Sequence, residues 1–303
     1  MLQGPERRTF GAFFMSRTVL GIIGGSGVYD IAGLAQARWE RVPSPWGEPS
    51  DALLFGTLDG VDMVFLPRHG RGHVQTPTTI NYRANIDALK RAGVTDVISL
   101  SACGSFREEL PPGTFVIVDQ FIDRTHNREK SFFGAGFVAH VSLAHPVCPK
   151  LTAALAAACA EANIPHRVGG SYLAMEGPQF STLAESKLYR SWGCSVIGMT
   201  AMPEAKLARE AELPYGLVAM VTDFDCWHED HDHVTVEQVV KVLAQNAERA
   251  RTLVRAVAPK LGPVRTPSPG IDNALDTAII TQKDKRDAAL FAKLDAVAGR
   301  VLK

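Results

Sequence analysis

The sequence has no excess of either charge and no long basic or hydrophobic run. Its 32 Lys and Arg residues balance 32 Asp and Glu residues, and no run of Lys or Arg exceeds a few residues, so nucleic acid is not expected as a partner. No apolar stretch approaches the roughly 18 to 20 residues that cross a bilayer. The N-terminal segment has only the short run Phe13 to Met15 after its arginines, which argues against a secretory signal. We therefore expect no membrane partner.

Cysteine is scarce as well, and no two cysteines form a C-x-x-C pair. An odd number of unpaired cysteines fits buried thiols in a reducing cytosol better than a disulfide framework or a zinc site. The sequence therefore predicts a cytoplasmic protein. The five are Cys103, Cys148, Cys159, Cys194 and Cys226.

What the 303 residues do contain is an alternation of short apolar runs with segments of helical spacing. Such alternation predicts an α/β fold, and the length suits one large domain with a sizeable core. The expected strands cover residues 18–23, 63–66, 97–100, 115–118, 196–199 and 217–221. The expected helices cover residues 78–92, 151–162, 183–192 and 201–212, and a long helix begins at Val236.

Three regions are expected along the chain: an extension over residues 1–17, a main domain over 18–262, and a linker with a helical tail over 263–303. The linker prediction depends on the prolines and glycines between Gly262 and Gly270, which cannot continue a helix. The tail is expected to be detached from the main domain. Its apolar residues would then need a cover, for example a neighbouring subunit.

Two carboxyl groups, Asp223 and Asp225, stand where the apolar run that begins at Tyr215 ends. Alternate positions on a strand share one face, so the two acids are expected side by side. Their repulsion and desolvation are unfavourable unless a ligand supplies hydrogen or positive charge between them. The sequence therefore predicts a ligand site at this strand end.

Other strand ends carry polar groups that admit a functional or an ordinary interpretation. The glycines from Gly24 to Gly27 could bring backbone N–H groups to an anion, or form a plain tight turn. The segment Pro67 to His73 offers guanidinium and imidazole donors for phosphate, or is a solvated basic loop. Residues 101–105 and Thr200 offer hydroxyl groups, but a turn and a helix N-cap explain them equally.

The cluster His228 to His233 mixes histidine with acids, yet its spacing is not that of a fixed zinc site. The ordinary interpretation is an exposed loop whose acids favour the N-terminus of the following helix. No metal site and no cofactor are predicted.

Seven motifs, taken in order, resemble those of the 5'-methylthioadenosine phosphorylase family. The resemblance runs from about Leu20 to about Val254 and does not include the tail. The motifs are Gly24-Gly-Ser-Gly27, Pro67-Arg-His-Gly-Arg71, Ser101-Ala-Cys-Gly-Ser105, Asp119-Gln-Phe-Ile-Asp-Arg-Thr125, Glu176-Gly-Pro-Gln-Phe-Ser181, Gly198-Met-Thr200 and Thr222-Asp-Phe-Asp-Cys-Trp227.

The resemblance implies a homotrimeric nucleoside-phosphorylase fold, with one central mixed β-sheet flanked by helices. Inorganic phosphate would attack S-methyl-5'-thioadenosine and yield adenine and 5-methylthioribose 1-phosphate, as in purine and methionine salvage. By this likeness, phosphate would be held by Ser26, Arg68, His69, Ser101, Ala102 and Thr200. The nucleoside would contact Phe180, Ser181 and Met199 together with Val236, Val239, Val240 and, from an adjacent subunit, His140. The three valines could equally be core residues.

The resemblance also places Asp223 and Asp225 at N7 and the 6-amino group of adenine. A carboxylate accepts a hydrogen bond from an amino group but repels a 6-oxo group, and oxopurine-specific relatives carry Asn where this chain has Asp223. If burial raises its pKa, Asp223 could protonate N7 as the base departs. These features favour 6-aminopurines as substrates.

Three alternatives remain open at this stage. A purine nucleoside phosphorylase that acts on inosine or methylthioinosine would share the fold, and a non-catalytic nucleoside sensor would bind without turnover. The glycines from Gly24 to Gly27 also suggest a dinucleotide-dependent oxidoreductase, but the fingerprint is incomplete because Asp30 stands where its third glycine should be.

Overall fold

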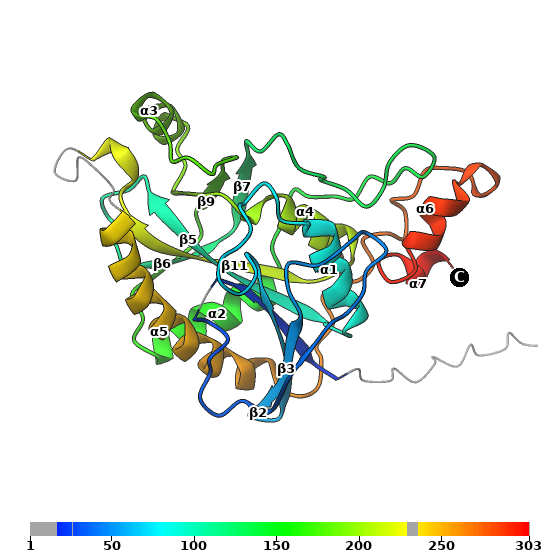
Figure 1. The fold of residues 1–303 in the computed structure, drawn as a ribbon, viewed down its shortest axis with the longest axis horizontal. Coiled ribbons are helices and arrows are strands. Elements are labelled where there is room, and N and C mark those ends of the chain that lie inside the picture. Colours follow the sequence, from blue (N-terminus) through cyan, green and yellow to red (C-terminus); the bar gives the residue numbers. More distant parts are fainter. Residues whose placement is uncertain (1–16, 26, 229–235, 303) are drawn as a thin grey trace, which may run out of the picture.

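The computed structural model describes residues 17–25, 27–228 and 236–302, with the backbone alone for 236–241. The chain forms one mixed β-sheet of eleven strands that is flanked by helices, in a single domain (Figure 1). The strands are β1 Val19–Gly24, β2 Ala35–Glu40, β3 Leu53–Leu58, β4 Val61–Pro67, β5 Asp96–Ser105, β6 Phe115–Val118, β7 Gln120–Asp123, β8 His166–Val168, β9 Ser171–Ala174, β10 Val196–Gly198 and β11 Tyr215–Asp223. The predicted fold class is confirmed.

The helices are α1 Tyr82–Arg91, α2 Pro149–Glu161, α3 Leu183–Ser191, α4 Ala201–Glu210, α5 Val236–Leu261, α6 Ala288–Lys293 and α7 Gly299–Leu302, with 3-10 turns η1 Asp225–Trp227 and η3 Lys283–Lys285. Local signals set several boundaries. The Asn81 side chain caps α1 by accepting from the Ala84 N–H (3.1 Å), so the helix begins at Tyr82 and not at Thr78 as predicted. Thr182 and Glu185 form a capping box that starts α3.

The sheet runs in the order β2-β3-β4-β1-β5-β10-β9-β7, and β11 pairs with β5 and β6. Strands β4, β1, β5 and β11 are mutually parallel where they pair. Their carboxyl ends therefore meet at one edge of the sheet. This edge is called the carboxyl edge below.

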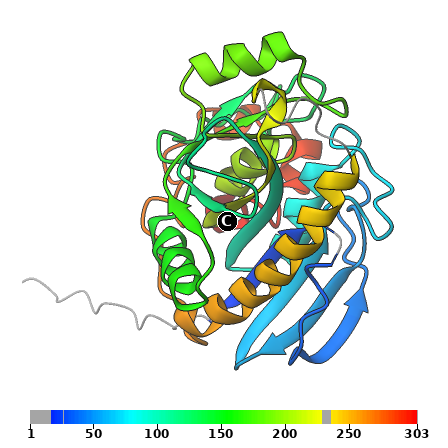
Figure 2. The same ribbon diagram turned by 90° about the vertical axis from the view of Figure 1, so that its left-hand side faces the viewer.

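Side chains alternate between two cores, one on each face of the sheet. On β1, Ile22 packs into the core beneath α2 and α5, whereas Ile23 packs into the core beneath α1 and α4. Helices α2 and α5 lie together on their face, as Figure 2 shows. The central strands are thus buried on both faces, which explains their continuous apolar runs.

The C-terminal segment is not detached, and this corrects the sequence-based expectation. Leu275, Leu294 and Val297 are at most 1% exposed and belong to the core that lies against α1 and α4. Figure 1 shows α6 and α7 beside these helices. The segment covers its own subunit, although Ile280 and Phe291 remain 61% and 40% exposed. The predicted boundaries after residues 17 and 262 stay predictions.

Five strands were not predicted: β2, β3, β7, β8 and β9. Strand β2 alternates apolar with polar residues but is exposed along its whole length, and two of its three apolar residues are alanines, so the alternation gives only a weak hydrophobic signal. Strands β8 and β9 have only three and four residues, and such short runs resemble loops in sequence. Within the described residues, no helix combines the length and the apolar character that crossing a membrane requires.

Candidate active site

The polar motifs singled out in the sequence converge on the carboxyl edge of the sheet. The Arg68 N–H donates to the Gly24 carbonyl (2.9 Å), which joins the ends of β4 and β1. Asp223 at the end of β11 is in register with Gly104 of β5. The predicted strand ended at residue 100, with either a donor segment or an ordinary turn over residues 101–105, but these residues continue β5 through to Ser105. Ser101 and Ala102 therefore lie within a central strand.

Arg68 is buried, 2% exposed, and most of its guanidinium N–H groups are already bonded. Its Nε and Nη2 donate to the Glu204 carboxylate (2.8 and 3.2 Å), Nη2 donates to Ser99 Oγ (2.5 Å), and Nη1 donates to the Leu100 carbonyl (3.0 Å). A guanidinium has five N–H groups, so one on Nη1 remains for a ligand. Although burial lowers the pKa of Arg68, the charge of Glu204 and the hydrogen bonds to it together outweigh burial and the pKa is raised.

Glu204 completes this buried ion pair and was not predicted as a site residue. It lies in the first turn of α4, and its carboxylate also accepts from Ser99 Oγ (2.6 Å) and the Tyr215 hydroxyl (2.8 Å). A buried pair is stable only when its remaining lone pairs and protons are satisfied, as here. The pair leaves Arg68 fixed in place and electrically neutralised.

A cluster of hydroxyl groups lies on the neighbouring strands. Ser101 Oγ is 3.3 Å from Thr200 Oγ1 and 3.1 Å from the Tyr172 hydroxyl. Ala102, the next residue, is the one exposed position along β5. An exposed residue in a central strand marks an opening over the sheet. The hydroxyl groups beside it are suitable donors to the oxygens of an anion.

His69 is neutral near pH 7, with a defined proton position. Its Nδ1 lies 2.9 Å from the Gln75 carbonyl oxygen, which can only accept, so we assign the proton to Nδ1. Burial, joined by the charge of Arg68, lowers the pKa of His69 to about 4. Its ring stacks on His73 with centroids 4.2 Å apart. Nε2 is therefore a hydrogen-bond acceptor.

Asp223 and Asp225 form the second polar group at the carboxyl edge. Asp223 Oδ2 accepts from Thr222 Oγ1 (2.6 Å), and Asp223 Oδ1 accepts from the Asp225 backbone N–H (2.8 Å). Asp225 is 6% exposed, and its Oδ2 atom is buried without a hydrogen-bond partner among the described residues. Neither carboxyl group forms an ion pair with a described cation.

Burial favours the protonated form of both carboxyl groups. Burial raises the pKa of Asp223, although bonds from Thr222 and the Asp225 backbone oppose the shift. Burial raises the pKa of Asp225 to about 6; the nearby charge of Asp223 adds to the shift, and the Ser186 and Ser181 hydroxyls oppose it. Two such groups titrate as a coupled pair, so the first proton added near neutral pH belongs to the pair.

The two acids lie close together for a different reason from the one expected. Strand β11 shifts register between Val221 and Asp223 and ends there, so Asp225 does not follow on the same strand face. Asp225 begins η1 with a φ of +52°, in the left-handed region. The turn brings its N–H back onto Asp223. Backbone strain of this kind concentrates at functional sites.

The expected nucleoside contacts lie next to the acid pair. Cys226 Sγ donates to the Ser181 carbonyl (3.4 Å), which ties the turn after Asp225 to the segment before α3. Phe180, in the same segment, is 58% exposed and open to a ligand. Met199 precedes Thr200, and its carbonyl accepts from Arg128 Nη1 (2.5 Å).

The contact between Arg128 and Glu176, two further residues near the site, was not predicted from the sequence. The Arg128 side chain is 1% exposed and donates to the carboxylate and to the carbonyl of Glu176 (3.4 and 2.6 Å) as well as to the Met199 carbonyl. The bonds hold the Glu176 turn against Met199. Glu176 stood in a quoted motif, but nothing in the sequence distinguished Arg128 from other arginines.

Several expected contacts cannot be placed. Ser26 and the side chains of Val236, Val239 and Val240 lie outside the described residues. His140 is described and is exposed, with its backbone N–H donating to the Ala278 carbonyl (2.9 Å). Of the cluster from His228 to His233, only His228 is described, and the described part of the chain contains no group of three side chains suited to a metal.

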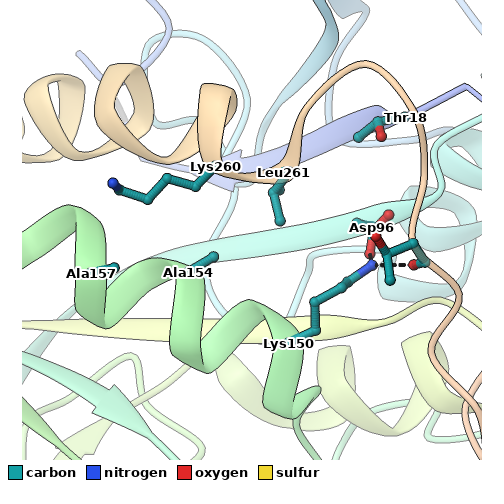
Figure 3. A pocket seen from close by; sticks show the side chains of 8 residues that line it. Thr18, Asp96, Lys150, Ala154, Ala157, Lys260 and Leu261 are labelled. Atoms are coloured by element: carbon teal, nitrogen blue, oxygen red, sulfur yellow. Dashed lines mark hydrogen bonds and ion pairs between the residues drawn. The ribbon is translucent and has the colours of Figure 1, made fainter.

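A surface hollow of about 480 Å³ lies away from the carboxyl edge. Figure 3 shows that Thr18 and Asp96 line it, at the amino ends of β1 and β5, together with Lys150 of α2. Lys150 Nζ already donates to Asp96 (2.6 Å) and to the Thr266 carbonyl (2.8 Å). Strand direction favours the opposite edge as the ligand site, because ligands of open α/β sheets bind at carboxyl ends.

Comparisons with known proteins agree with this geometry. The family model described as Phosphorylase superfamily matches residues 19–259. The S-methyl-5'-thioadenosine phosphorylase of Rhodospirillum rubrum is 67% identical over 285 residues, which cover 94% of this chain and 97% of the relative. The protein of the same name from Cereibacter sphaeroides is 63% identical over 95% of this chain and 99% of its own length.

Solved structures give the same result. A methylthioadenosine phosphorylase from an antarctic soil metagenomic library superposes with a TM-score of 0.88 at 43% identity, covering 92% of this chain and 98% of that one. The Schistosoma mansoni methylthioadenosine phosphorylase in complex with adenine has a TM-score of 0.77 at 37% identity, with 81% and 92% covered. The chain therefore belongs to the phosphorylase superfamily and, within it, to the S-methyl-5'-thioadenosine phosphorylases.

Proposed function

We propose that the chain catalyses the phosphorolysis of S-methyl-5'-thioadenosine by inorganic phosphate to adenine and 5-methylthioribose 1-phosphate. It is a pentosyltransferase of purine and methionine salvage. The observation that carries the proposal is the buried pair Asp223 and Asp225, which has no described cation for a partner, at the edge that also holds the hydroxyl cluster. The relatives named above support the substrate, since they are phosphorylases of this nucleoside.

Phosphate would bind over Ala102. Ser101, Thr200 and the remaining Arg68 N–H would donate to its oxygens, and Ser26 would add a further hydroxyl. Neutral His69 could accept from a protonated phosphate oxygen through Nε2. Because Glu204 neutralises Arg68, hydrogen bonds and not net positive charge would hold the anion beside the sugar.

The base would bind at the acid pair, between Phe180 and Ser181 on one side and Met199 on the other. As the bond between C1' and N9 breaks, its electron pair moves into the purine, and Asp223 would donate a proton to N7. Asp225 would accept a hydrogen bond from the 6-amino group, which would satisfy its unpartnered Oδ2. Asp223 at N7 would also border the 6-position, so a 6-oxo group would meet carboxylate oxygens of both acids and 6-aminopurines are favoured.

The assembly and location complete the proposal. A homotrimer would bring His140 of one subunit to the 5' end of the nucleoside in the next, where Val236, Val239 and Val240 would form an apolar wall. The exposure of His140 supports this role, and a stable monomer in sedimentation would remove it. A cytoplasmic location is supported by the five free cysteines.

The direct test is release of free base from S-methyl-5'-thioadenosine and, in parallel, from 5'-methylthioinosine, each with and without phosphate. Phosphate-dependent release of adenine with little hypoxanthine is expected. A preference for the inosine substrate would indicate an oxopurine enzyme. Saturable binding without turnover would indicate a sensor, and either result would overturn the proposal.

A further inference from the structure

The Thr222 hydroxyl lies between two acceptors, although it has only one hydrogen to donate. Its Oγ1 is 2.6 Å from Asp223 Oδ2 and 3.1 Å from the Cys103 carbonyl oxygen of β5. Thr222 is 5% exposed, so water cannot readily replace either bond. The hydroxyl can donate to one oxygen at a time, and its other role must be that of an acceptor.

The Thr222 hydroxyl can donate a hydrogen bond in either protonation state of Asp223. When Asp223 is ionised, the Thr222 hydroxyl donates to Oδ2. When Oδ2 carries a proton, that proton is available to N7 of a bound purine, and the Thr222 hydrogen can turn to the Cys103 carbonyl. The protonated state therefore keeps the Cys103 carbonyl paired with Thr222, whereas the ionised state gives the single Thr222 hydrogen to the carboxylate, the acceptor that gains most from it.

We propose that Thr222 is a positioning residue for proton transfer by Asp223, and that its hydrogen moves from the Cys103 carbonyl to Asp223 Oδ2 during the reaction. This inference depends on the proposed function. The Asp223 O–H bond breaks and the N7–H bond forms, while the C1'–N9 electron pair enters the purine. The Thr222 O–H bond stays intact and only rotates, so it stabilises the carboxylate as the carboxylate forms.

The trio lies among several ionisable groups. The described ones on the elements around Asp223 include Asp225, Cys226 and His228 in and after η1, Cys103 of β5, Glu185 and Arg190 of α3, Glu204 of α4 and Arg249 of α5. Arg190 lies over the Trp227 ring, and Arg249 donates to the Gly113 carbonyl (2.8 Å). Among these groups, the Asp225 carboxylate bears most directly on Asp223. Its negative charge disfavours the ionised form of Asp223 unless a hydrogen-bond donor stabilises that form.

The test compares Thr222→Val, which keeps the β-branched shape but lacks the hydroxyl, with Thr222→Ser, which keeps the hydroxyl. For Thr222→Val, kcat is expected to fall about 10- to 100-fold, the loss of one hydrogen bond to a charged group. KM should change less, and the limb of the kcat profile assigned to the acid should move to higher pH. Thr222→Ser should restore both towards wild type.

A purely structural role would not produce this pattern. If Thr222→Val keeps kcat within about twofold and its pH profile is unmoved, the inference is wrong, since one such bond is expected to change a rate by about tenfold or more. If Thr222→Ser is as impaired as Thr222→Val, the hydroxyl is not the active feature and the inference is also wrong. Thermal unfolding of both variants checks that they fold.

A second measurement separates this inference from the proposed function. The carboxyl carbon of Asp223 can be followed by NMR in protein labelled with 13C aspartate, with Asp223→Asn to assign the signal. The pKa of Asp223 is expected to be higher in Thr222→Val than in wild type, and an unchanged pKa would overturn the inference. This titration decides the role of Thr222 even if the wild-type protein releases no adenine.

Discussion

Glu204 and Asp225 are both buried carboxyl groups, 2% and 6% exposed, yet their surroundings differ. Glu204 accepts hydrogen bonds from Arg68, Ser99 and Tyr215, which satisfy its charge within the fold. Asp225 has a buried oxygen without a hydrogen-bond partner among the described residues, lies beside a second carboxyl group, and sits on strained backbone. Glu204 therefore stabilises the fold, whereas Asp225 is placed to accept a hydrogen bond from a ligand.

The comparison separates residues needed for stability from residues needed for the reaction. Burying an acid without a cation costs free energy, and a protein can retain such a group where a ligand uses it. Arg68 looked from sequence like a free phosphate-binding cation, but the structure makes it one half of the scaffold pair. The changes below test this division, beginning with the largest expected effect.

Asp223→Ala should impair the reaction without destabilising the fold. Loss of the proton donor to N7 is expected to reduce kcat about a hundredfold or more. The free energy of unfolding should not fall, because the carboxyl group is costly to bury. Steady-state kinetics with urea unfolding as the companion measurement would check this. A variant with near wild-type kcat would show that another group delivers the proton.

Glu204→Gln should destabilise the fold. The change leaves the Arg68 charge buried without a counter-ion, and the free energy of unfolding is expected to fall by about 3 to 5 kcal/mol. Urea unfolding midpoints at an unchanged slope would measure the loss. The matched control is Glu248→Gln, whose carboxylate is 70% exposed beside Arg251, and which should change stability by less than about 1 kcal/mol. A loss as small as the control's would contradict the scaffold role.

Asp225→Asn should increase the free energy of unfolding, the opposite of the effect of Glu204→Gln. The pKa of Asp225 is raised to about 6 in the folded protein, so between pH 4 and 6 the folded state binds more protons than the unfolded state. Stability therefore falls as pH rises through this window. Removing the ionisable group should increase the free energy of unfolding by about 1 to 3 kcal/mol at pH 8, with no gain near pH 4.

The Asn side chain also tolerates the left-handed backbone at position 225. Unfolding curves collected from pH 4 to pH 8 would show the gain as a difference in slope between wild type and variant. A variant that is less stable than wild type at pH 8 would mean that the Asp225 carboxylate is satisfied in the fold.

Arg71→Gln should have the smallest effect and sharpens the contrast with Arg68. Both arginines come from one sequence motif, but Arg71 is half-exposed and pairs with Asp51 at 2.9 Å. Exposed pairs contribute little, so stability should change by less than about 1 kcal/mol, and phosphate dependence should be retained. Urea unfolding and the KM for phosphate check both statements. A large rise in KM would place Arg71 in the anion site.

The sequence allowed the layers and the strand-end motifs to be predicted because buried parallel strands have continuous apolar runs and glycine-rich or polar ends. Strand β2 was not predicted because two of the three apolar residues in its alternating pattern are alanines, which give little hydrophobic signal. The tail's apolar residues were visible, but the surface that covers Leu275 and Leu294 is formed by distant segments. No local pattern encodes that contact.

The candidate site was predictable in the same uneven way. Asp223 was identified correctly as the end of a strand, whereas the turn that gives Asp225 a positive φ has no glycine to announce it. The pairing of Arg68 with Glu204 joins residues 136 positions apart, and Arg128 approaches Met199 from a loop 71 positions away. Such contacts depend on the sheet order, which a single sequence does not reveal.

The central claim is that the acid pair, which has no described cation for a partner, selects the base. It is tested most directly by the ratio of kcat/KM for S-methyl-5'-thioadenosine to kcat/KM for 5'-methylthioinosine, measured for wild type and for Asp223→Asn. We expect the ratio to fall at least about tenfold in the variant, because an amide can donate to a 6-oxopurine where a carboxylate cannot. An unchanged ratio, with full activity on the adenine nucleoside, would contradict the claim.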